Sequence, residues 1–188
     1  MNRESHHHYL IHLLRRAYSG ELAAGFAYRG HWKSIRNEYE RAAIQKIERE
    51  EWIHRERDGE MLISLGARPK KSREAKLWLI GKSIGAACHL IGSFLPMYFA
   101  GRLEGGNVIE YETAASQAAA LGLNQFEADL REMARVEKEH ELFFLNMVVG
   151  HRMLPLISSL FGWGKLTHTE AQLPQETVTS EVADASIT

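Results

Sequence analysis

Apolar residues recur every three or four positions along most of the chain, which is the period of an amphipathic α-helix packed on one face. Four long segments show this period and are predicted helices: residues 9–36, 38–65, 96–121 and 124–150. Gly66 ends the second segment, and Gly122 separates the third from the fourth, for which Asn124 is the expected N-cap. Long helices joined by short connections are typical of a helical bundle.

The segment Leu77–Ala100 is the most apolar part of the chain and is long enough to cross a membrane. Lys82, His89 and Pro96 interrupt it, however, so we predict a separate helix at residues 74–92. The segment also contains four small residues that favour close packing between helices: Gly81, Gly85, Ala86 and Ala87. We interpret it either as a buried crossover between the second and third bundle helices or as a surface that dips into a membrane.

Two of the predicted bundle helices carry a Glu and a His three positions apart in the middle of an apolar stripe. These pairs are Glu51 and His54 in the second helix, and Glu137 and His140 in the fourth. Residues three apart lie on the same face of a helix, so each pair can hold one metal ion. A single pair of this kind is usually a solvated surface pair, but two pairs centred in apolar stripes are hard to explain in that way.

The other two bundle helices each place a carboxylate on the stripe that should face the core. Glu21 does so in the first helix and Glu104 in the third. Glu110 and Glu112 compete with Glu104 for this role, but both are offset from the apolar stripe. The periodicity therefore favours Glu104.

Buried carboxylates without a partner are costly, so these core positions need a shared cation. Four-helix bundles that bind two irons take a Glu-x-x-His from each of two helices and one Glu from each of the other two. The sequence therefore predicts a dinuclear metal centre with six ligands: Glu21, Glu51, His54, Glu104, Glu137 and His140. Asp58, which follows His54 by about one turn, is expected either to orient that imidazole or to lie at the surface.

The overall composition limits the alternatives. A net charge of −1 over 188 residues argues against nucleic acid as a partner, and the single cysteine, Cys88, excludes an internal disulfide and a four-cysteine iron centre. The first residues lack the apolar run of a signal peptide, which predicts a cytoplasmic protein. We expect the bundle at residues 1–150, a C-terminal apolar segment at 151–165 and a disordered acidic tail at 166–188.

With these residues placed, the sequence resembles the demethoxyubiquinone monooxygenase family of ferritin-like di-iron proteins over about residues 14–150. The resemblance rests on motifs in the same order: SGE around Glu21, EREEWIH ending at His54, ARP after the second helix, LEGGNVIEY containing Glu104, and EKEH ending at His140. It implies an all-α, ferritin-like four-helix bundle with an extra apolar helix between the second and third helices. It also implies that the six residues above bind iron and that the Leu77–Phe99 region admits a quinone from a membrane.

The resemblance further implies a role in quinone binding or electron transfer for Tyr111, which follows Glu104 by two helical turns. Directly before this tyrosine, the family commonly carries His where the present chain has Glu110. Tyr111 and Glu110 are therefore the candidate catalytic residues, and the exact substrate and the electron-transfer step stay open at this point.

The primary expectation is a di-iron monooxygenase that hydroxylates a quinone-type apolar substrate with O₂, as in ubiquinone biosynthesis. Its reducing equivalents would come from outside, from NADH or a reductase, because the sequence has no nucleotide-binding glycine motif. Manganese would accept the same ligands as iron. The alternatives are a ferritin-like di-iron oxidase or peroxide scavenger, and a metal-binding scaffold of the same fold. Peripheral attachment to the inner face of a membrane and assembly into a homo-oligomer are further expectations.

Overall fold

The computed structural model describes residues 2–164, and within this range the protein consists of helices without any strand. The six helices of this range are α1 Arg3–Ser34, α2 Glu38–Ser64, α3 Lys71–Ala87, α4 Phe94–Leu121, α5 Asn124–Val148 and α6 Leu154–Phe161. The predicted all-α class is confirmed. Residues up to His151 form one compact unit, and α6 belongs to a second unit that begins at Arg152. The predicted tail at residues 166–188 lies outside the described residues.

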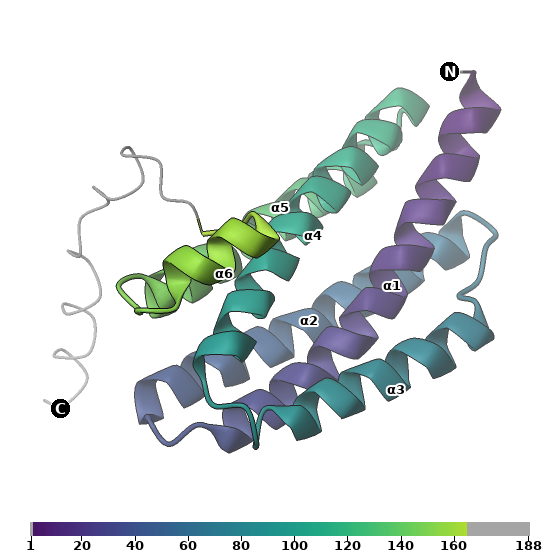
Figure 1. The fold of residues 1–188 in the computed structure, drawn as a ribbon. Coiled ribbons are helices and arrows are strands. Elements are labelled where there is room, and N and C mark those ends of the chain that lie inside the picture. The colour runs from purple at the N-terminus through teal and green to yellow at the C-terminus, as the bar shows by residue number, and fades with distance from the viewer. Residues whose placement is uncertain (1, 165–188) are drawn as a thin grey trace, which may run out of the picture. The chain divides into compact units, whose positions relative to one another are not determined.

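Helices α1, α2, α4 and α5 form a bundle (Figure 1). Helix α1 packs against α2 and α4, and α5 packs against α4 and α2, so the four helices surround a common core. The connections within the α1–α2 pair and within the α4–α5 pair are short, which makes the helices of each pair antiparallel. Helix α3 packs on α1 and carries the chain back along the bundle from the end of α2 to the start of α4.

Capping residues explain where the bundle helices begin and end. Asn2 accepts a hydrogen bond from the backbone N–H of Ser5 at 2.8 Å and so caps α1, which begins before the predicted residue 9. Asn37 caps α2 in the same way. Helix α4 stops at Gly122, whose φ of 75° lies in the left-handed region that favours glycine.

Further predictions about helix ends also differ from the structure. Asn124 is not an N-cap, because the left-handed turn at Gly122 reverses the chain so tightly that Asn124 is already helical, with Leu123 at the capping position. The helix predicted at residues 74–92 is α3, which both begins and ends earlier. It cannot extend to residue 92, because Gly92 has a left-handed φ of 74° in the turn that leads to α4.

Glycines allow α3 to pack closely on α1. A Cβ atom on Gly30 of α1 would overlap the backbone of Gly85 on α3. A Cβ atom on Gly81 would likewise overlap the backbone of Ala23. Both glycines of α3 are buried, whereas Trp78 on the same helix is 46% exposed. The prediction that small residues favour close packing here is confirmed for these glycines, and none of the described helices has the length and apolarity needed to cross a bilayer.

The core of the bundle changes character along its length. Near the α4–α5 turn it is apolar and includes the fully buried side chains of Leu14, Leu62 and Leu130. Towards the middle of the bundle, the same inward-facing stripes continue with buried acidic and histidine side chains. The fold therefore places a polar cluster inside an otherwise apolar core.

Candidate metal centre

The structure brings the six predicted metal ligands together in the middle of the bundle. Each of them is at most 3% exposed. Within the described residues, they form two overlapping groups whose candidate ligand atoms lie within 4.8 Å of one another: Glu21, Glu51, His54 and Glu137 in one, and Glu51, Glu104, Glu137 and His140 in the other. Two glutamates, Glu51 and Glu137, belong to both groups. The cluster can therefore hold two metal ions that share a pair of carboxylates.

Each antiparallel helix pair supplies half of the centre. Helices α1 and α2 provide Glu21 and His54 for the first group and one of the shared glutamates. Helices α4 and α5 provide Glu104 and His140 for the second group and the other shared glutamate. This distribution is the one that di-iron carboxylate bundles show.

Several buried polar atoms of the centre lack a hydrogen-bond partner. They are Oε2 of Glu21, both carboxylate oxygens of Glu51 and Nδ1 of His140. Leaving a buried polar atom unpaired costs about 1–3 kcal/mol, so this cluster needs another group that binds these atoms. Carboxylate oxygens and imidazole nitrogens are ligands that iron and manganese accept. The residues present therefore fit a pair of such ions.

The electrostatics of the cluster also call for cations. Burial raises the pKa of Glu21, Glu51 and Glu104, and for the last two the neighbouring carboxylates raise it further. Glu137 differs, because burial raises its pKa but the neighbouring His54 and His140 outweigh this effect and lower it. A bound cation would stabilise the charged form of all these carboxylates.

Two buried tyrosines connect the halves of the bundle across the centre. The Tyr28 hydroxyl on α1 donates a hydrogen bond to Glu104 on α4, and the Tyr111 hydroxyl on α4 donates to Glu21 on α1 at 2.6 Å. Each tyrosine follows the glutamate of its own helix by seven residues, so it lies on the same stripe. The sequence predicted a role for Tyr111 but not for Tyr28, although this shared spacing could have revealed it.

A carboxylate from outside the six predicted ligands contacts one of the two imidazoles, but it is not the predicted Asp58. Asp58 is fully buried, with Oδ2 placed 3.2 Å from the Tyr111 hydroxyl, so it has neither of the two roles expected for it. Instead, Oε2 of Glu50 lies 2.9 Å from Nε2 of His140. Such a contact fixes the ring orientation of a metal-binding histidine. Glu50 was missed because it lies beside the inward stripe of α2, and its partner is on α5.

The three rival glutamates of α4 occupy different places. Glu104 is in the centre, where Nδ2 of Asn107 donates to its Oε2 at 2.9 Å. Glu110, a candidate catalytic residue, belongs to neither group and forms an ion pair with Arg16 at 3.0 Å. Glu112 is exposed. Periodicity favoured Glu104, and Glu104 is the most deeply buried of the three glutamates.

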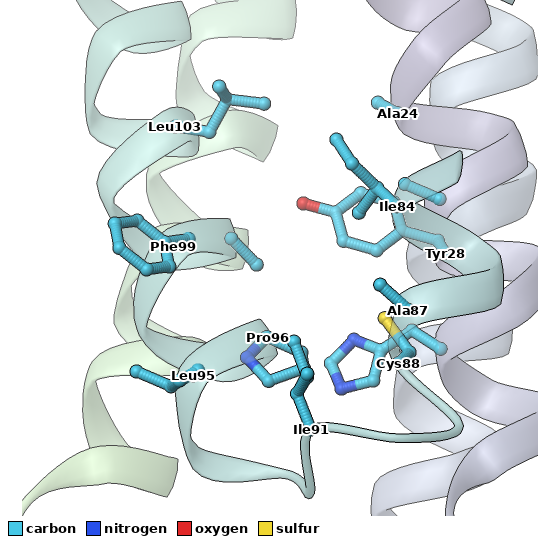
Figure 2. Close-up of a pocket in the computed structure, with 13 residues that line it drawn as sticks. Ala24, Tyr28, Ile84, Ala87, Cys88, Ile91, Leu95, Pro96, Phe99 and Leu103 are labelled. Carbon is cyan, nitrogen blue, oxygen red and sulfur yellow. The ribbon is translucent and has the colours of Figure 1, made fainter. Parts of the chain in front are cut away.

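An apolar cavity of about 450 Å³ lies between α1, α3 and α4 (Figure 2). Figure 2 shows Ile84 of α3 and Cys88, which follows α3, on one wall and Phe99 and Leu103 of α4 on the opposite wall. The hydroxyl of Tyr28 points into the space between these walls. Because the same hydroxyl donates to a carboxylate of the centre, Tyr28 joins the cavity to the candidate metal site.

Comparisons with known proteins do not reveal a relative. No family model matches the chain, and no match was found among curated proteins or solved structures. The described residues form a helical protein with a buried carboxylate and histidine cluster that could hold metal ions.

Proposed function

We propose that the protein is a ferritin-like di-iron monooxygenase that hydroxylates a quinone-type ring with O₂, as demethoxyubiquinone monooxygenases do. The observation that carries this proposal is the contact between a dinuclear ligand set and an apolar cavity through one side chain, Tyr28. An iron-storing oxidase or a peroxide scavenger needs the ligand set but has no use for a cavity of this kind.

Iron suits the centre because four carboxylates balance the charge of two ions, and hard oxygen ligands stabilise the ferric state. When bound, two ferrous ions would supply the reducing power for O₂ chemistry beside an apolar substrate. Manganese would satisfy the same ligands. The electrons that complete each turnover have to come from outside, from NADH or a reductase.

The chain's own residues would hold the ligands and keep water out. Tyr28 and Asn107 both donate to Glu104, and Tyr111 donates to Glu21, so two of the carboxylates are fixed before any metal binds. The apolar walls of the cavity would exclude water from the ring that is oxidised.

The mouth of the cavity suits a substrate that arrives from a membrane surface. Ile91 and Phe99 line the cavity and are 50% and 40% exposed, and the adjacent Leu90 is 86% exposed. An exposed apolar group of this kind favours contact with lipid. Co-sedimentation of the protein with phospholipid vesicles should therefore be lost in the double variant Leu90→Glu/Ile91→Glu. Equal sedimentation of this variant would contradict membrane attachment at the mouth.

The proposed function is tested by measuring iron per chain and then O₂ consumption with a short-chain quinone and a reductant. We expect about two irons per chain and quinone-dependent O₂ consumption that is lost in Glu104→Ala. The matched control is Glu112→Ala, the same substitution at an exposed position of the same helix, which should keep both properties.

The outcomes separate the candidate functions. Two irons without any effect of the quinone would contradict the monooxygenase and favour an iron oxidase or, with peroxide-dependent turnover, a scavenger. Bound metal without redox activity would favour a scaffold. A chain that binds no metal would overturn all three.

A further inference from the structure

The wall of the apolar cavity contains one polar side chain whose hydrogen bonding is incomplete. His31 follows Tyr28 by about one turn on α1, lines the cavity and is only 2% exposed. Its Nε2 is buried without a hydrogen-bond partner. An unpaired buried polar atom costs about 1–3 kcal/mol, so this nitrogen calls for a partner that the chain does not supply.

Water is a poor candidate for that partner. A buried water typically needs roughly two to four hydrogen-bonding groups around it. Among the described residues of the lining, the remaining polar side-chain groups are the hydroxyl of Tyr28, which already donates to a carboxylate, and the thiol of Cys88. A thiol is only a weak hydrogen-bonding group. The site therefore favours a ligand that brings its own oxygen on an apolar body.

The protonation state of His31 indicates which ligands fit. Burial lowers the pKa of His31 to about 4, so the imidazole is neutral at neutral pH. A neutral imidazole has one nitrogen that donates and one that accepts. It can pair with a carbonyl or methoxy oxygen and also with a hydroxyl, so both a quinone and its reduced form fit. No charged residue occurs among the described lining residues, which favours an uncharged ligand.

A metal-binding role for His31 has no support. It belongs to neither of the two candidate metal groups of the described chain. Burial also raises the pKa of the Cys88 thiol to about 11, so the sulfur in the same wall stays protonated and is a poor metal ligand.

We propose that His31 hydrogen bonds to a ring oxygen of the ligand in this cavity and thereby selects an oxygenated ring over a hydrocarbon of similar shape. The inference rests on the proposed function, because a ring held there lies beside Tyr28 and hence beside the centre. An attached apolar chain would leave the cavity past Ile91 and Phe99 at its exposed mouth.

The test compares two probes, a decyl-substituted dimethoxybenzoquinone and decylbenzene, which carries the same chain on a ring without oxygens. Their dissociation constants are measured by calorimetry on the full chain at a fixed detergent concentration. In His31→Phe, which keeps a ring but removes the nitrogens, binding of the quinone should weaken about tenfold while binding of decylbenzene stays within about twofold. His31→Gln, which restores hydrogen bonding, should recover most of the loss.

Two further variants keep the test decisive. Ile84→Val trims an apolar part of the same wall and should change the binding of both probes equally. His31→Leu replaces His31→Phe if the latter loses its helical circular dichroism. Equal weakening of both probes by the His31 variants, or quinone binding that does not respond to them, would overturn the inference.

The inference and the proposed function fail in different ways. In one case, the His31 variants lose quinone binding selectively, while the wild-type protein shows no quinone-dependent O₂ consumption. This result would support the hydrogen bond and contradict the monooxygenase. Quinone-dependent O₂ consumption with unchanged quinone binding in His31→Phe would support the monooxygenase and overturn the role of His31.

Discussion

The two halves of the bundle supply matching ligands but surround them differently. On one side, Tyr28, which is hydrogen bonded to Glu104 of α4, faces the apolar cavity. On the other, Tyr111 lies beside a buried aspartate and lines a smaller cavity of about 250 Å³. This second cavity shares Ile84 and Leu103 with the first, but its lining also includes Arg16, Arg73 and Glu110. The ligand sets of the two sides are alike, but their surroundings differ, because only the second cavity has charged residues among its described lining residues.

The halves also differ in how each histidine is held. Nδ1 of His54 lies 2.7 Å from Oε1 of Glu137, inside the centre. His140 has an additional carboxylate outside the centre, because its Nε2 lies 2.9 Å from Glu50, which Lys46 contacts in turn at 2.7 Å. This additional contact orients the imidazole of His140.

The largest effect is expected from removing a shared glutamate. Glu51→Ala should abolish binding of both ions, because this carboxylate belongs to both groups. Glu104→Ala should leave about one ion bound in the group that contains Glu21 and His54. Metal per chain, measured by mass spectrometry after anaerobic loading with ferrous iron, checks both. A Glu51→Ala protein that still holds one ion would show that the groups are independent.

The metal-free protein should lose stability as the pH rises from 6.5 to 9. Burial alone would lower the pKa of His140, but the neighbouring carboxylates of Glu137 and Glu50 raise it to about 9. A raised pKa stabilises the fold at pH values below the ordinary pKa of histidine, and this stabilisation is lost as the pH rises above the raised pKa. The free energy of unfolding should fall by an amount on the order of 3 kcal/mol. Urea unfolding at several pH values measures it.

Metal-loaded protein is the control for this pH dependence. A bound ion requires a neutral imidazole, so the loaded form should keep its stability over the same range. A metal-free protein with constant stability between pH 6.5 and 9 would contradict the contacts assigned to His140.

A smaller effect is expected from Glu50→Gln, which removes a carboxylate that orients one histidine only. The affinity of one of the two ions should fall about 10–100-fold, and that of the other should stay the same. Stepwise titration with ferrous iron under anaerobic conditions distinguishes the two ions. Glu56→Gln, an exposed position of the same helix, serves as the control. Equal weakening of both ions would indicate a general loss of structure instead of misorientation.

The smallest effect concerns the two tyrosines. Without metal, Tyr111→Phe should lower the free energy of unfolding by about 1–3 kcal/mol, because Glu21 and Asp58 both lose a buried partner. Tyr28→Phe should cost less, since Asn107 still donates to the carboxylate that Tyr28 contacts. Urea unfolding of both metal-free variants gives the comparison, and a larger loss for Tyr28→Phe would reverse the order proposed for the two sides.

Local sequence patterns were enough to predict the helices and the six clustered residues. The Glu-x-x-His spacing of Glu51 with His54 is visible within one turn, and the apolar period shows that Glu104 and not Glu112 faces inward. Asn2 went unrecognised as a cap, so the start of α1 was placed too late.

The remaining features depend on which helices become neighbours in space. The contact between Glu50 and His140 joins residues 90 positions apart, and its geometry exists only once α2 and α5 pack. The partner of Asp58 was likewise on another helix. The unpaired nitrogen of His31 could be noticed only after α3 and α4 had enclosed it with apolar side chains.

The glycine contact between α1 and α3 has a mechanical consequence for the cavity. Helix α3 places Gly81 and Gly85 against α1, and Ile84 and Ala87 from the same turns line the cavity. A Cβ atom at Gly30 or Gly85 would push α3 away from α1 and so displace the α3 wall of the cavity. The width of the cavity therefore depends on glycines that do not line it, and substitutions at these positions would change its size.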